Sequence, residues 1–479
     1  MSKLMDTYGK LGLTNSKTTC SVDVPDISFE LLNDGKWHFY FDFTTEQQLK
    51  GYLGIYVNSG NATIDFGDGT PIATLSEEGI NYTYHEYSSL GEYRIDIEGD
   101  ITITGEKSVG SYLWRPYTPS SDLPINLYAY SDYGLQALKF VEIPYGVTSI
   151  ENFAFSDCRS LQSVNLPDGL ITIGNKAFYR CYSFQSINIH NGLTSISDDS
   201  FNDCYSLKSI NLPDGLISIG SGAFSGCYSL QDISIPDGVT SIGSKAFNNC
   251  YSLQSIKLPY GLTSIESNTF QICTSLQTVN LPDGLTHIRS AAFSSCGSLK
   301  SINFPDSLIS IGSGAFSGCY SLQDISIPDG VTSIGSTAFN SCYSLQSINI
   351  PDGLTIIGSG AFNNCFSLQD ISIPDGVTSI GNSLFNACYA LKNIKLPGGV
   401  TIIGDGAFSN CYTLTADFTA ISLVNGVLPI TIGLKVFQNL NATYGAKLLF
   451  ANKEIADVAK TTTNLTAYAN LIHYVGEDA

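Results

Sequence analysis

Twelve of the thirteen cysteines in this 479-residue chain recur at a fixed interval of 23 residues, from Cys158 to Cys411. Three roles compete for them: disulfide bonds, metal coordination and buried packing. On stacked parallel strands the Cβ atoms stay about 4.8 Å apart, whereas a disulfide brings them to about 3.8 Å. Zinc needs four convergent ligands, which a straight column without histidines does not offer. The spacing therefore favours reduced, buried cysteines and folding in a reducing compartment.

The same 23-residue period runs through the sequence around the cysteines and defines the elements that would position them. The copy beginning at Leu230 reads LQDISIPDGVTSIGSKAFNNCYS. Apolar residues at its first, fourth and sixth positions fit a short strand with one buried face, which Pro-Asp-Gly ends in a turn. A second extended piece (VTSIG) and an Ala-Phe turn lead to the cysteine. Twelve copies run from Leu138 to Thr413, which predicts a solenoid of stacked turns.

The repeat frame also predicts one buried aromatic column, built from the phenylalanine that precedes each cysteine. Its members are Phe178, Phe201, Phe224, Phe247, Phe270, Phe293, Phe316, Phe339, Phe362, Phe385 and Phe408. Stacked rings of this kind pack the core and imply no chemistry.

Composition and motifs exclude several functions. Charged residues make up 14% of the chain, and 43 acidic against 23 basic residues give a net charge of −20. Such a chain cannot collect phosphates, so we expect no nucleic-acid binding. No apolar run reaches signal-peptide or membrane-helix length, so we expect no membrane insertion. The five histidines fall in no catalytic or metal-binding motif, so we expect neither enzymatic activity nor a cofactor or metal.

The repeat frame LxxIxIPxGxxxIGxxAFxxCxS resembles the BspA-like (Treponema pallidum-type) leucine-rich repeat family, from Leu138 to about Leu414. It differs from the ordinary leucine-rich repeat, in which an asparagine or cysteine follows the strand, because here the cysteine precedes it. Known members of the family are surface adhesins and host-interaction proteins of bacteria and some protozoa. The resemblance therefore implies a surface-exposed binding protein.

A second resemblance lies near the N-terminus, where IDFGDGT (residues 64–70) is followed by HEYSSLGEYRIDI (residues 85–97). This pair of motifs resembles the PKD domain, an immunoglobulin-like β-sandwich. Ile64 departs from the family pattern, which usually has tryptophan there. The resemblance implies an anchor or spacer, with Asp65 and Asp68 forming turns in preference to a calcium site.

The predicted fold is mainly β: a leucine-rich-repeat solenoid of about twelve 23-residue repeats with caps, preceded by an immunoglobulin-like (PKD-like) β-sandwich. The predicted parts are a leader or attachment segment (1–20), the PKD-like domain (21–108), an N-terminal cap and joint (109–134), the repeats (135–413) and a C-terminal cap (414–479).

Candidate ligand-binding residues lie on the outward side of the predicted solenoid. The fifth position of each repeat points away from the core and gives a row of short polar groups: Asn165, Asn188, Asn211, Ser234, Asn280, Asn303 and Asn349. One interpretation is a solvated sheet face, and the other is a repetitive hydrogen-bonding surface for a polysaccharide. A hydrophobic protein-binding groove is disfavoured because apolar anchors are missing.

A tyrosine follows many of the cysteines and forms a second candidate surface: Tyr182, Tyr205, Tyr228, Tyr251, Tyr320 and Tyr343. Stacked tyrosines cover apolar surface between turns, which is a structural role. They are also favoured in interfaces, which would make the stripe a contact surface.

These features predict a non-enzymatic, surface-exposed adhesin whose solenoid recognises a cell-surface polysaccharide or surface protein. The alternative is a structural virion component, a phage fibre or capsid-surface protein, that contacts virion proteins through residues 1–108 and itself attaches to a host. Either function places the protein outside cells, on a cell surface or on a virion surface, although no signal peptide is visible. Symmetric oligomers would favour the virion component.

Overall fold

The computed structural model describes residues 36–43, 50–76, 79–102, 115–116, 137–440 and 445–476. The predicted leader at residues 1–20 and nearly all of the predicted joint at residues 109–134 lie outside these ranges. All described residues belong to one unit of the chain, residues 35–479.

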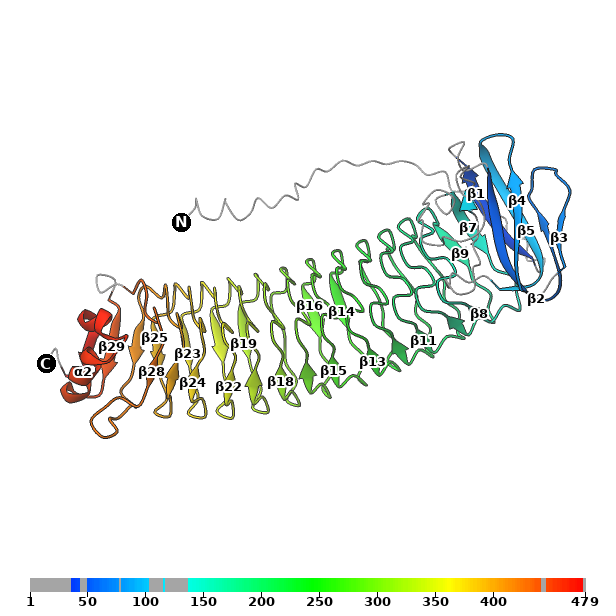
Figure 1. The fold of residues 1–479 in the computed structure, drawn as a ribbon. Helices are drawn as coiled ribbons and strands as arrows, with labels where there is room; N and C mark the ends of the chain where they lie inside the picture. Colours follow the sequence, from blue (N-terminus) through cyan, green and yellow to red (C-terminus); the bar gives the residue numbers. More distant parts are fainter. Residues whose placement is uncertain are drawn as a thin grey trace. The chain divides into compact units, whose positions relative to one another are not determined.

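The structure confirms the predicted solenoid, in which each turn has a short second strand and most turns also have a short first strand (Figure 1). The first strand of the repeats is formed by β7 (Leu138–Glu142), β9 (Ser163–Asn165), β14 (Ser255–Lys257), β16 (Thr278–Asn280), β19 (Asp324–Ser326), β21 (Ser347–Asn349), β23 (Asp370–Ser372), β25 (Asn393–Lys395) and β27 (Thr415–Asp417). The second strand is formed by β8 (Ser149–Ile150), β10 (Thr172–Ile173), β11 (Ser195–Ile196), β12 (Ser218–Ile219), β13 (Ser241–Ile242), β15 (Ser264–Ile265), β17 (His287–Ile288), β18 (Ser310–Ile311), β20 (Ser333–Ile334), β22 (Ile356–Ile357), β24 (Ser379–Ile380), β26 (Ile402–Ile403) and β28 (Thr431–Ile432).

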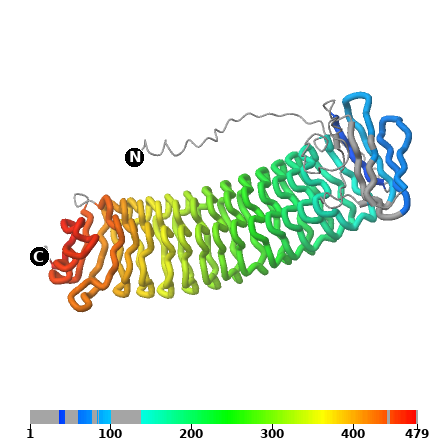
Figure 2. Tube along the Cα trace, in the orientation of Figure 1, coloured from blue at the N-terminus to red at the C-terminus, as the bar shows by residue number. Residues whose placement is uncertain are grey.

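Strand pairing in the solenoid is parallel and follows the repeat. Ser218 of β12 pairs with Ser241 of β13, its equivalent 23 residues later. The tube in Figure 2 shows the resulting turns stacked along the chain. Because every turn repeats the same apolar positions, each position forms a column, and the register cannot slip without misaligning all columns together.

The aromatic column is longer than the sequence indicated. Thirteen phenylalanines stack from Phe155 to Phe437, with neighbouring ring centroids 5.3–5.7 Å apart. Tyr468 closes the C-terminal end, because its ring stands edge-on to Phe437 at 5.6 Å and 85°. Offset and edge-on contacts are the arrangements that aromatic rings prefer.

The backbone turn around each phenylalanine has a regular feature that the sequence did not reveal. Two residues in nearly every repeat adopt left-handed backbone angles, and glycine fills only some of these positions. Ile272, at φ +62°, and Thr337, at φ +55°, are β-branched and still adopt these left-handed angles. The conformation is costly for such residues, so the stacked turns must hold it in place.

The N-terminal strands are β1 (Trp37–Phe43), β2 (Lys50–Asp65), β3 (Ala73–Leu75), β4 (Gly79–Glu86), β5 (Gly91–Thr102) and β6 (Arg115–Pro116). They link in the order β3-β2-β5-β1, with β4 and β6 also paired to β2. A sandwich would divide them between two packed sheets, and this pairing does not make that division. The immunoglobulin-like domain at residues 21–108 therefore stays a prediction.

The N-terminal sheet continues directly into the solenoid. β1 pairs antiparallel with β7, the strand of the first repeat, and places His38 opposite Glu142. Glu142 occupies a fifth position, which the repeat frame turns outward, but only 3% of its surface is exposed. This fifth position is therefore closed to solvent, unlike those at Asn188 and Asn211.

The C-terminal end is closed by β29 (Lys447–Phe450), α2 (Lys453–Thr461), the 3-10 helix η3 (Thr466–Leu471) and β30 (Ile472–Tyr474). β29 and β30 extend the sheet of first strands beyond β27. The last second strand, β28, is capped by Asn464, whose Nδ2 donates to the Ile432 carbonyl at 2.7 Å. Terminal turns of a solenoid need such closure because their strand edges would otherwise stay open. The predicted boundary at residue 413 stays a prediction.

Candidate binding surface

The outward third- and fifth-position side chains of the first strands form a surface that we call the strand face. Strands β14, β16, β19, β21, β23 and β25 each show an exposed, buried, exposed pattern, with the buried residue facing the core. Asn165 is half-buried, and the other predicted residues of the row are exposed: Asn188, Asn211, Ser234, Asn280, Asn303 and Asn349. The structure therefore places short amide and hydroxyl groups in a row open to solvent.

The predicted tyrosines stack into a regular stripe beside the first strands. Tyr182, Tyr205, Tyr228 and Tyr251 form one run, with ring centroids 4.4–4.7 Å apart and planes within 20° of parallel. The Arg159 guanidinium lies over the Tyr182 ring at 5.3 Å and covers the end of this run. Stacking at this spacing shields one face of each ring from water, which accounts for the structural role.

A second run of stacked rings follows after a gap. Tyr320, Tyr343, Phe366, Tyr389 and Tyr412 stack with centroids 4.5–5.4 Å apart. Their edges remain accessible, and Tyr320 is 47% exposed. Partial burial raises the pKa of Tyr320, so its hydroxyl is neutral and can donate a hydrogen bond at physiological pH. The stripe therefore combines apolar edges with hydrogen-bonding groups.

The cysteine column is built for packing. All twelve repeat cysteines are buried and free. From the second onward, each thiol donates a hydrogen bond to the phenylalanine carbonyl of the preceding turn, with Sγ to O distances of 3.1–3.3 Å. Burial raises the pKa of Cys273 and of Cys319 to about 12, which suppresses the reactive thiolate. Within the described ranges, no group of three or more His, Cys, Asp or Glu side chains could hold a metal ion.

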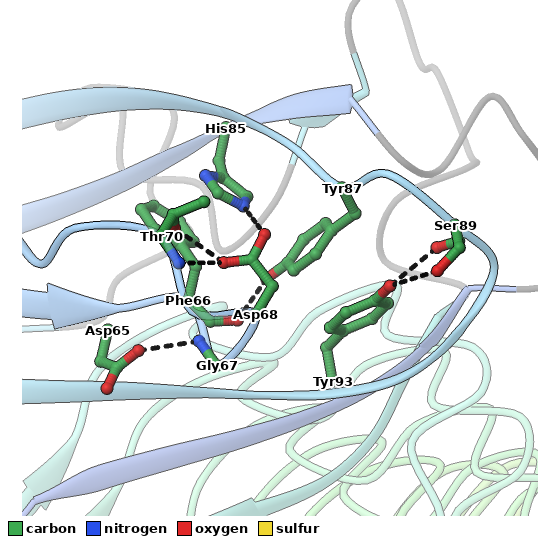
Figure 3. A network of polar contacts seen from close by, with 9 residues as sticks. All are labelled: Asp65, Phe66, Gly67, Asp68, Thr70, His85, Tyr87, Ser89 and Tyr93. Carbon is green, nitrogen blue, oxygen red and sulfur yellow. Dashed lines mark hydrogen bonds and ion pairs between the residues drawn. The ribbon is translucent and has the colours of Figure 1, made fainter.

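In the N-terminal sheet, Asp68 lies at the centre of a polar network (Figure 3). Its carboxylate accepts hydrogen bonds from the Thr70 amide at 3.1 Å, the Thr70 hydroxyl at 2.7 Å and His85 Nε2 at 2.8 Å. Although partial burial acts in the opposite direction, these bonds from Thr70 and His85 lower the pKa of Asp68. Asp65 accepts from the Gly67 amide at 2.9 Å. Both aspartates thus have turn-forming contacts.

The aromatic part of this network fixes the strands that follow the turn. The His85 ring lies parallel to Phe66, with centroids 4.0 Å apart. The buried Tyr87 donates its hydroxyl hydrogen to the Phe66 carbonyl at 3.1 Å, and Tyr93 donates to the Ser89 carbonyl at 2.9 Å. The two motifs quoted from the sequence are therefore packed against each other in one cluster.

The comparisons with known proteins agree with this geometry. The model of the BspA type leucine rich repeat region, which spans six copies of the repeat, matches three times, over residues 125–250, 194–323 and 309–443. Together these ranges exceed half of the sequence, and the chain belongs to this family. No curated protein matches the chain.

Several solved structures are similar to the chain. A leucine-rich repeat protein from Bacteroides ovatus ATCC 8483 is 33% identical over 65% of this chain and 86% of its own, with a TM-score of 0.55. A leucine rich cell surface protein from Faecalibacterium prausnitzii A2-165 is 32% identical over 58% of this chain and 78% of its own, with a TM-score of 0.42. A leucine-rich repeat protein of T. pallidum is 33% identical over 34% of this chain and 78% of its own, with a TM-score of 0.33.

Membrane insertion was also tested on the structure. Among the described parts of the chain, no helix combines the length and the apolar character that crossing a bilayer requires.

Proposed function

We propose that the protein is a non-enzymatic, surface-exposed adhesin that binds a cell-surface glycan or protein through the strand face of its solenoid. The observation that carries the proposal is the repeated row of exposed asparagine and serine side chains beside the stacked tyrosine stripe. Amide and hydroxyl groups both donate and accept hydrogen bonds, and tyrosine adds apolar area at low entropic cost. Membership of the BspA type family supports a binding role.

The N-terminal sheet acts in this proposal as the anchor or spacer. Its strand β1 is hydrogen-bonded to β7 along His38 to Phe41, so that the solenoid begins on a fixed support. Support of this kind holds a binding face at a defined distance and orientation. The module need not contact the ligand itself.

The test is binding of the purified full chain to a panel of bacterial surface polysaccharides, host glycans and fixed cells. A face-blocking variant carries Asn280→Arg, Asn303→Arg and Asn349→Arg. A matched variant carries three arginines on exposed residues that directly precede the second strands β15, β20 and β24: Thr263→Arg, Thr332→Arg and Thr378→Arg. We expect saturable binding that only the first variant abolishes. If the face-blocking variant bound as well as the matched variant, the contact would lie elsewhere on the protein.

A further inference from the structure

Two identical segments of the solenoid occupy different surroundings. Residues 216–244 and 308–336 share the sequence LISIGSGAFSGCYSLQDISIPDGVTSIGS, 92 residues apart. The turns on either side of them differ, so the same side chains are presented to solvent in two contexts. The comparison isolates what the neighbouring turns contribute.

The second copy borders a groove of about 640 Å³. Its walls are third- and fifth-position residues of three successive turns: Ser301, Asn303, Asp324, Ser326, Ser347 and Asn349. Phe304 and Pro328, both half-buried, add apolar surface, whereas the side chains of Ile302, Ile325 and Ile348 are buried and face the core. This volume lies within the roughly 300–1,000 Å³ of small-molecule sites. The equivalent residues of the first copy, Asp232 and Ser234, lie outside the groove.

The turn before the second copy differs from the turn before the first copy at two positions that make distinctive contacts. Phe304 stands where the first copy is preceded by Leu212, and its ring turns inward, edge-on to Phe316 at 5.6 Å. Ser307 replaces a glycine, and its hydroxyl donates to the Asp283 carbonyl at 2.6 Å and lies 2.7 Å from the Leu285 carbonyl. Phe304 thus ties the turn to the core, and Ser307 ties it to the preceding turn. The outward polar row stays accessible.

The aromatic stripe begins again within the second copy, at Tyr320, after its gap. Gly297 occupies the tyrosine position of the preceding turn, and a Cβ atom there would lie 3.2 Å from the Tyr320 ring. The Tyr320 ring therefore lies against the Gly297 backbone, a close approach that glycine allows. Tyr320, whose ring is exposed, is four residues before Asp324, which lines the groove.

The chemistry of the lining selects an uncharged ligand rich in hydroxyl groups. The described lining residues include Asp306 and Asp324 and no lysine or arginine, so an anionic ligand would meet only like charge. Asp324 is oriented by the Ser347 hydroxyl, which donates to it at 2.7 Å, and the carboxylate keeps further acceptor capacity. By contrast, the first copy is followed by Lys257 and Tyr260 where the second has Asn349 and Asp352.

We propose that the groove along Ser301–Asn349 is a subsite for an uncharged polysaccharide. The sugar hydroxyls would donate to Asp306 and Asp324 and exchange hydrogen bonds with Asn303 and Asn349. The inference rests on the proposed adhesin function and narrows it to one ligand class and one place on the strand face.

The test measures binding of the full chain to yeast mannan, dextran, laminarin and xylan, with heparin as the anionic comparison. Asp324→Ala is compared with Asp232→Ala, which removes the same exposed side chain from an identical segment. Asn303→Ala is compared in the same way with Asn211→Ala. Equal thermal unfolding of each pair shows that neither change disturbs the fold.

We expect at least one uncharged polysaccharide to bind, and Asp324→Ala and Asn303→Ala each to weaken that binding about tenfold, the loss of one well-placed hydrogen bond. Asp232→Ala and Asn211→Ala, which lie on the strand face outside the groove, should weaken it less. Equal effects within each pair, binding of heparin alone, or binding to none of the five would overturn the subsite. The adhesin function is tested separately by the panel of surface polysaccharides, host glycans and cells.

Discussion

The solenoid and the N-terminal sheet achieve stability in opposite ways. In the solenoid the same contact recurs every 23 residues, as the phenylalanine column and the thiol hydrogen bonds show. In the N-terminal sheet a contact such as the one between Asp68 and His85 occurs once. Repetition lets the outward positions change from turn to turn while the core columns stay the same. Substitutions on the strand face, where we place binding, therefore need not disturb the core columns.

The largest effect is expected from breaking the phenylalanine column. Phe339 is fully buried between two stacked rings, so Phe339→Ala should lower the free energy of unfolding by about 3–5 kcal/mol. Tyr343→Ala in the same turn removes a ring that is 38% exposed and should cost about 1 kcal/mol. Urea unfolding followed by circular dichroism measures both. Equal losses would show that the column is no more important than the surface stripe.

The next effect should be confined to the N-terminal sheet. Asp68→Ala removes a carboxylate that accepts three hydrogen bonds, at a cost of about 2–3 kcal/mol. Hydrogen exchange should quicken in β4 and β5 and stay unchanged in the repeats beyond β9. Faster exchange throughout the solenoid would contradict the separation of the two regions.

The same carboxylate gives the N-terminal sheet a pH dependence. Because its pKa is lowered on folding, Asp68 stabilises the sheet at neutral pH, and that contribution disappears as the pH falls below the usual aspartate value of about 3.9 and through the lowered one. In melts between about pH 6 and pH 3, Asp68→Asn should weaken the acid sensitivity of the N-terminal sheet. Asp324→Asn, on the solenoid, serves as the control. An unchanged acid profile in Asp68→Asn would refute this role.

A smaller effect is expected from the cysteines. Cys319→Ala removes one buried thiol and its hydrogen bond at 3.2 Å to Phe293, and should cost about 1 kcal/mol. In a Cys20→Ser background, the twelve repeat thiols should resist a thiol reagent in the folded protein and react after unfolding, because burial raises their pKa values. A drop in melting temperature on adding reductant would indicate disulfides and contradict the assignment of free, buried cysteines.

The smallest effect should be a gain in stability. Ile272 holds a left-handed backbone that disfavours a β-branched residue, whereas Asn249, Asn364 and Asn410 occupy the same position in other turns. Ile272→Asn should therefore raise the free energy of unfolding by about 0.5–1 kcal/mol. Asn249→Ile should lower it. A loss of stability in Ile272→Asn would mean that packing of the isoleucine outweighs its backbone strain.

The repeat frame predicted most of the solenoid because its information is local and repeated. The strand pattern, the buried cysteines and the exposed row from Asn188 to Asn349 all follow from a period of 23 and from which positions are apolar. The stacking of Tyr182 on Tyr205 follows from the same period.

Features that depend on contacts across the chain were not predictable. The pairing of β1 with β7 joins segments about 100 residues apart and has no counterpart in the repeat. The burial of Glu142 in the first turn does not follow from the repeat frame either. The left-handed turn at Ile272 has no glycine to mark it. The groove appears only when the turns are stacked, because residues of three turns line it.

The central claim, that the strand face binds a glycan, is tested most directly by hydrogen exchange of the full chain with and without a bound polysaccharide. The peptides LKSINFPDS (299–307) and LKSINLPDG (207–215) differ in sequence and report separately on the turns that precede the two copies. We predict slower exchange in the first peptide and in residues 345–353, with a smaller change in the second. Protection confined to the second strands or to the N-terminal sheet would contradict the account.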